Sequence, residues 1–222
     1  VMSGESVSST SGALLLRTAS SPESGDLILS TGVATSGPSG ALLIGSGGAT
    51  DGASGGVKIA VGSGDTGAGG NLVLSSGETT TSNGLVGGSV TMTTGYSEFT
   101  SSGPMTLYTS NAGISGVSGQ LVLSTGTASQ GNSGALYIGS GSSSYGRGGA
   151  VYVSVGSGNS GAGGELVLSA GTSSDVSGGR LSMVSGVGAH SSGALLLHTA
   201  NAGVSGVSGQ LVLSTGTASK GN

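Results

Sequence analysis

A short apolar pattern recurs along the whole chain about every 15 residues. The repeating unit reads G-x-Φ-x-Φ-x-[T/S/V]-G, where Φ is aliphatic, and clear copies begin at Gly25, Gly70 and Gly119. Its first aliphatic residue stands at Leu14, Leu27, Leu42, Val57, Leu72, Val90, Met105, Leu121, Leu136, Val151, Leu166, Leu181, Leu195 and Leu211. These 14 units span 197 residues in 13 intervals, a mean spacing close to 15. Such a repeat constrains the architecture strongly, because one short unit cannot bury its own apolar residues.

Aliphatic residues at alternate positions predict a β-strand with one face turned inward. No 3.6-residue periodicity is present, and the Gly, Ser and Thr residues between the units disfavour helices. We therefore expect an all-β fold, a β-solenoid with rungs of about 15 residues. The small residues in the second half of each unit predict a flattened rung. In this arrangement each strand bonds to the rungs above and below, and leucine stacks on leucine along the axis.

A longer repeat lies on top of the short one. Residues 110–132 and 200–222 match at 20 of 23 positions with a shift of 90, which predicts a six-rung superrepeat. We expect residues 1–222 to form a single continuous β-solenoid array. Val1 aligns with the middle of a strand, and Gly221-Asn222 stops inside a unit, so no polar capping rung is seen at either end. An uncapped solenoid exposes its strand edges, so we expect an interior segment of a longer repeat chain or a unit that polymerises end to end.

The composition excludes several partners. The chain has five Lys and Arg residues, scattered along its length, and a net charge of −4, so we expect no nucleic-acid binding. The longest apolar runs, such as Ala13–Leu16, are far shorter than the roughly 20 residues of a membrane helix, and we expect no membrane span. Cysteine is absent, which excludes disulfides and thiolate metal sites.

No catalytic, cofactor or metal site is predicted, and we expect that the protein is not an enzyme. Residues 62–67 and 156–161 spell G-x-G-x-x-G, but the sequence leads straight into the next strand instead of the helix that phosphate binding needs. His190 and His198 have no carboxylates at ligand spacing, and no calcium-binding repeat occurs. No Ser/His/acid arrangement is suggested either.

The outward positions of the predicted strands carry an unusual apolar column. The middle residue between the two aliphatic positions is apolar or Tyr in ten of the 14 units. We call these residues the stripe and predict that they form a lateral packing surface: Leu15, Ile28, Leu43, Val73, Val122, Tyr137, Tyr152, Val167, Leu196 and Val212. Strands that are apolar on both faces are normally covered on both faces. The cover is either another copy, which means lateral or end-to-end self-association, or a wider fold of the same chain.

Two further readings stay open. A column of Thr and Ser, among them Thr31, Thr125 and Thr215, resembles the ladder of ice-binding solenoids. Val61, Val155 and Ala170 interrupt the column, and its parity with the Leu positions predicts that it faces the interior of a rung. An ice-binding or surface-adhesive solenoid is therefore the alternative function. No N-x-[S/T] sequon occurs, whereas O-glycans on the Ser/Thr-rich corners remain open.

Units such as Ser118–Gly126 resemble the Gly/Ser-rich repeats of very large secreted surface proteins of unicellular algae and their relatives, and the β-solenoid shafts of adhesins. The resemblance covers essentially the whole chain and carries no functional residues with it. It implies an extracellular or cell-surface structural protein that forms a filament, fibre or surface layer. We expect this function to depend on rung stacking and on lateral packing of the stripe.

Overall fold

The chain contains neither helices nor strands in the residues that its computed structural model describes, which are 3, 11–80 and 84–218. The expected all-β fold, a β-solenoid, is therefore wrong. The chain forms extended and bent coil instead, and it divides into two units, Val1–Tyr108 and Thr109–Asn222. The following local features recur within each unit.

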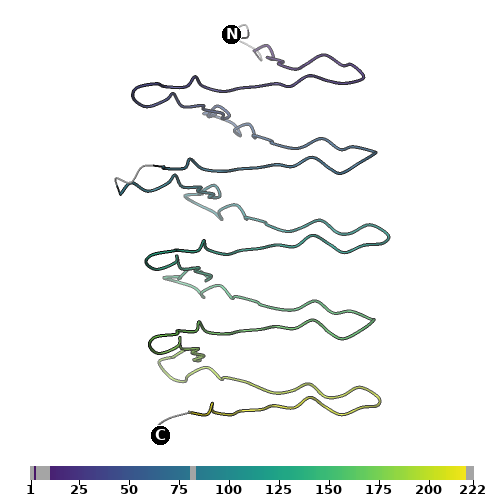
Figure 1. Cartoon of the computed structure of the whole chain (residues 1–222), viewed down its shortest axis with the longest axis vertical. Helices are drawn as coiled ribbons and strands as arrows, with labels where there is room; N and C mark the ends of the chain where they lie inside the picture. Colours follow the sequence, from purple (N-terminus) through teal and green to yellow (C-terminus); the bar gives the residue numbers. More distant parts are fainter. Residues whose placement is uncertain (1–2, 4–10, 81–83, 219–222) are drawn as a thin grey trace. The chain divides into compact units, whose positions relative to one another are not determined.

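Nearly straight runs alternate with narrow bends in the backbone trace (Figure 1). We define a run as the seven residues from the glycine that opens a repeat to its Thr, Ser, Val or Ala residue. The fourteen runs cover residues 12–18, 25–31, 40–46, 55–61, 70–76, 88–94, 103–109, 119–125, 134–140, 149–155, 164–170, 179–185, 193–199 and 209–215. Every run has the same length, so the variation in repeat spacing comes from the bends alone.

The runs are not strands because their backbone groups have no ladder partner. In the described part of the chain, four backbone–backbone hydrogen bonds form, and each joins the start of one run to the residue just after the preceding run. Examples are Gly88 N–H to Gly77 O at 2.9 Å and Gly179 N–H to Gly171 O at 2.8 Å. A solenoid needs such bonds along the whole of each rung, to the rungs on both sides. Consecutive runs here meet only at their ends.

Most bends are closed by a contact that we call the neck. The neck joins the last residue of one run to the glycine that opens the next. Thr31 Oγ1 donates to Gly40 O at 3.2 Å, Thr109 Oγ1 to Gly119 O at 3.1 Å, and Ser140 Oγ to Gly149 O at 2.7 Å. These side-chain hydrogen bonds hold the two ends of a bend together. They take the place of the stacking between rungs that the sequence predicted.

The bends turn at glycines in the left-handed region. Gly37 and Gly131 both have φ of 98°, and each stands three residues before its neck glycine, Gly40 or Gly134. Only glycine adopts such angles without a steric penalty from a Cβ atom. The regular placement of these glycines explains how the chain reverses within a few residues.

No hydrophobic core exists in the described residues, because none of them is buried. The exposed area is 22151 Å² for a 20.5 kDa chain. A globular monomer of this mass exposes about 9,000 Å², and the unfolded chain about 30,000 Å². The predicted stacking of leucine on leucine within the chain is therefore wrong, since a single chain leaves most of its apolar surface in water.

Two expectations concern residues at the ends of the chain. The placement of Val1 in a strand and the interruption of a unit at Gly221-Asn222 lie outside the described residues. Within the described ranges, the search for a helix of sufficient length and apolarity to cross a membrane finds none.

Candidate functional surface

All ten stripe residues lie in the described part of the chain and are exposed. Their exposed fractions run from 66% at Val122 to 92% at Tyr137. Each stripe residue is the fourth residue of its run, and ten of the fourteen runs contain one. Lys58, Thr91, Thr106 and Ser182 occupy this position in the remaining runs. The structure thus presents the stripe as free apolar surface.

The aliphatic residues that we expected to point inward are exposed as well. The first aliphatic residue of each run is between 51% exposed at Leu121 and 64% exposed at Leu14. It is thus less exposed than the stripe, but it covers no core. Both faces of each run are available to a partner, and the distinction between an inner and an outer face that the alternating pattern predicted is weak in the single chain.

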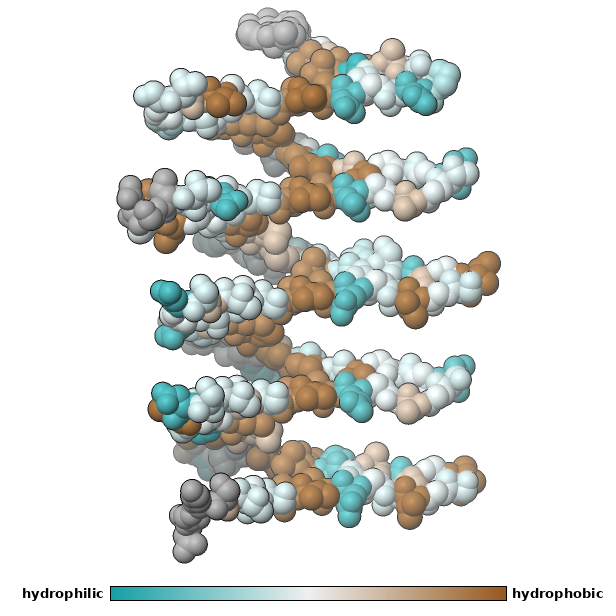
Figure 2. All heavy atoms as spheres, in the orientation of Figure 1, coloured by the Kyte–Doolittle hydropathy of each residue, from teal (hydrophilic) through white to brown (hydrophobic). Residues whose placement is uncertain are grey.

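Apolar and polar residues separate along the chain at the scale of the run. Figure 2 shows hydrophobic side chains gathered over the runs and mostly polar or weakly polar side chains over the projecting bends. The separation follows from the sequence, because the aliphatic residues fall within the runs while the bends consist mainly of Gly, Ser and Thr. Large aliphatic patches on a protein surface mark sites of association.

The necks are a structural feature that sequence reasoning missed. The least exposed residues of the described chain are Thr18, Ser97, Thr109 and Ser185, and three of these four belong to the Thr/Ser column. We had expected this column to face the interior of a rung. The available signal was the recurrence of a glycine eight to ten residues after most column residues, as in Thr31 and Gly40.

Some of the neck glycines are required by close contact. A Cβ atom on Gly164 would lie 2.7 Å from Val155 Cγ1, and one on Gly70 would lie 2.8 Å from Val61 Cγ1. Such distances are shorter than real Cβ contacts, and the β-branched valine has little freedom to rotate away. The opening glycine of the repeat thus permits the neck to close.

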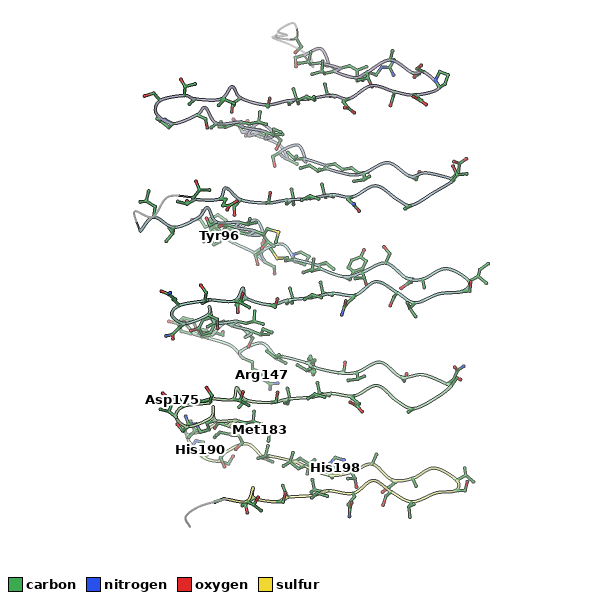
Figure 3. All side chains as sticks on the ribbon, viewed as in Figure 1. Tyr96, Arg147, Asp175, Met183, His190 and His198 are labelled. Atoms are coloured by element: carbon green, nitrogen blue, oxygen red, sulfur yellow. The ribbon has the colours of Figure 1, made fainter. Side chains whose placement is uncertain are left out.

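The remaining candidate groups are not assembled into a site. Figure 3 shows Asp175 and His190 on separate bends and His198 on the run that follows. In the described part of the chain no group of three or more His, Cys, Asp or Glu residues gathers to hold a metal, and no pocket is present. The two G-x-G-x-x-G segments lie in bends, where their last glycines, Gly67 and Gly161, have φ of 85° and 76°. Their backbone continues to a neck and not to a helix.

Comparison with known proteins gave no match. No family model, no curated protein and no solved structure matches it.

Proposed function

We propose that this protein is a structural repeat protein that associates with copies of itself into an extracellular or cell-surface filament, fibre or layer. The observation that carries the proposal is the absence of any buried residue in the described chain, combined with an apolar group at almost every repeat. Ordering a residue costs about 1–2 kcal/mol of backbone entropy. Since apolar burial within the chain offsets little of this cost, the surface of other molecules must supply the remainder.

In the proposed assembly, contacts between copies replace the contacts that were expected between rungs of one chain. We expected the structural role to depend on stacking of rungs within one chain, and the described residues do not stack in this way. Lateral packing of the stripe remains, because the stripe residues are exposed. Low charge favours such packing, since 6% charged residues and a net charge of −4 produce little repulsion between copies.

An isosteric change at the stripe tests the proposal. Replacing Val73, Val122, Val167 and Val212 by Thr keeps the β-branched shape and removes apolar surface. At about 0.8 kcal/mol for each methyl group withdrawn from an apolar contact, the four changes should raise the protein concentration required for assembly about two-hundredfold. Sedimentation and electron microscopy measure this concentration and the form of the material.

The matched control places the same substitution in the bends. Val33, Val117, Val187 and Val207 are 94–97% exposed and lie outside the runs, and their replacement by Thr should leave assembly unchanged. Equal behaviour of the two quadruple variants, or compact monomers at every concentration of the unmodified protein, would contradict the proposed function.

The alternative of an ice-binding or surface-adhesive face has less support. Ice binding depends on a regular array of free hydroxyl groups, and the hydroxyls of Thr31, Ser76, Thr109 and Ser140 donate to backbone carbonyls at the necks. Thermal hysteresis of the soluble protein distinguishes the two functions. A structural protein should show none.

A further inference from the structure

The runs expose backbone as well as side chains. Between the necks, the described runs form no backbone–backbone hydrogen bonds, so both edges of a run such as 119–125 offer N–H and C=O groups. Ten of the fourteen runs also carry apolar or Tyr residues on both faces, as in Leu121, Val122 and Leu123. A single extended segment with these properties resembles a strand that lacks its neighbours.

When another molecule covers the apolar faces of a run, the backbone of that run needs hydrogen-bond partners. When Leu121, Val122 and Leu123 lose contact with water, the peptide groups between them lose it too. Buried N–H and C=O groups are almost always hydrogen-bonded, and each one left without a partner costs free energy. The covering surface must therefore supply donors and acceptors along the length of the run, which is what a second extended backbone does.

The area to be covered indicates the size of the partner. The chain exposes 22151 Å², which is about 13,000 Å² more than a globular monomer of its mass. Standard protein–protein interfaces bury about 1,200–2,000 Å² in total. A small partner at one place therefore leaves most of this surface in water. The partner must follow the chain through all of its runs.

The repeat spacing indicates which partner fits. A chain that pairs with every run must present seven-residue apolar segments separated by bends of similar size. A second copy of this chain meets both requirements, because its fourteen runs have the same length and recur at the same mean spacing. The scarcity of charge also removes the usual barrier to pairing between identical edges.

We infer that copies of this chain pair edge to edge along their seven-residue runs through backbone hydrogen bonds. The inference rests on the proposed self-association and names its mode. The stripe then packs on the faces of the paired runs, and the necks set the boundaries at which pairing stops.

Mixed isotope labelling tests this mode of association. Chains labelled with ¹⁵N are mixed with chains labelled with ¹³C before assembly, and solid-state NMR transfer from amide nitrogen to carbonyl carbon then reports backbone contacts between chains. We expect signals from the Leu, Val and Ile residues of the runs. Material assembled separately and mixed afterwards is the control and should give no signal.

The outcomes separate the two proposals. Sedimenting material without signals between labelled chains would overturn edge pairing and leave the structural function standing. Failure of the unmodified chain to sediment at any concentration would overturn both.

Proline variants give a second measurement. Val122→Pro removes an amide hydrogen in the middle of run 119–125, while Val122→Ala shortens the same side chain and keeps the amide. We expect the proline variant to require at least about tenfold more protein for assembly than the alanine variant, because proline cannot donate to a partner strand. Equal requirements for the two variants would overturn edge pairing.

The chain itself offers the matched control for proline. Asn132 follows Gly131 in one bend as Pro38 follows Gly37 in another, and both glycines have φ of 98°. Asn132→Pro therefore places proline where an equivalent bend already accepts it, and this variant should assemble as the unmodified chain does. A loss of assembly as large as that of Val122→Pro would show that proline acts without regard to the runs and would overturn the inference.

Discussion

The opening glycine of some repeats owes its place to contact between atoms. At Gly164 and Gly70 no left-handed φ is involved, and the constraint is the valine side chain at the end of the preceding run. Where the preceding run ends in Ala170, a Cβ on Gly179 would meet the backbone N of Gly171 at 3.2 Å. A side chain at one neck and backbone atoms at another thus impose the same requirement, because the two runs approach closely at these necks.

Alanine at a neck glycine should open the neck. For Gly164→Ala we expect a cost of about 1–3 kcal/mol, as for other overpacked contacts. The nuclear Overhauser contact between the Val155 methyl groups and residue 164 should weaken in this variant. Gly163→Ala is the control, since a Cβ there has no neighbour within 4 Å. Identical contacts in the two variants would contradict the steric account.

The bends are stabilised by short-range hydrogen bonds of hydroxyl side chains. Ser97 Oγ accepts from Thr100 N–H at 3.1 Å and shares a 2.8 Å hydrogen bond with the Thr100 hydroxyl. Ser173 Oγ accepts from Val176 N–H at 3.1 Å in an equivalent arrangement. Serine side chains that bond to the backbone in this way compete with regular secondary structure. Their abundance outside the runs explains why the chain bends at these places.

Removing one of these hydroxyls should loosen a single bend. In Ser97→Ala the Thr100 amide loses its acceptor, at a cost of about 0.5–1.5 kcal/mol, and should exchange with solvent a few-fold to tenfold faster. Amide hydrogen exchange measures the change. Ser101→Ala serves as the control in the same bend, because its side chain forms no hydrogen bond with any other described residue. Equal exchange rates in both variants would contradict a role for Ser97.

The whole chain combines a large apolar surface with very little charge. Its mean hydropathy is +0.26, and charged residues make up 6%. Association of such a chain depends on the removal of apolar surface from water and hardly at all on ion pairs. The solvent conditions that govern assembly follow from this balance.

Assembly should respond to the kind of salt more than to ionic strength. Between about 0.05 and 0.5 M sodium chloride, the concentration needed for assembly should change by less than about threefold, because few charges are available for screening. Sodium sulfate should lower it, since excluded salts strengthen apolar burial. Sedimentation at matched ionic strength measures both effects. A steep dependence on sodium chloride would indicate that charge governs association.

The predictable part of this protein is its linear order. The spacing of Leu14, Leu27 and their successors predicted extended segments separated by bends, and the backbone trace alternates between nearly straight segments and bends, although none of the described segments is a strand (Figure 1). The G-x-G-x-x-G segments were expected to lead into the next extended segment and not into a helix, and both lie in bends that contain no helix. These features depend on near neighbours in the chain and therefore can be read from residue types.

The β-solenoid prediction was wrong because it assigned each run a pairing partner within the same chain. The sequence by itself determined the length of the runs, the position of the bends and the placement of the stripe, for these are local properties. Only the tertiary structure decided that the end of one run meets the opening glycine of the next, as Thr31 meets Gly40, and that no run lies along another as a strand. The physical reason is that an apolar run specifies the need for cover and not its source, so the same leucines fit a neighbouring turn of one chain or a second molecule.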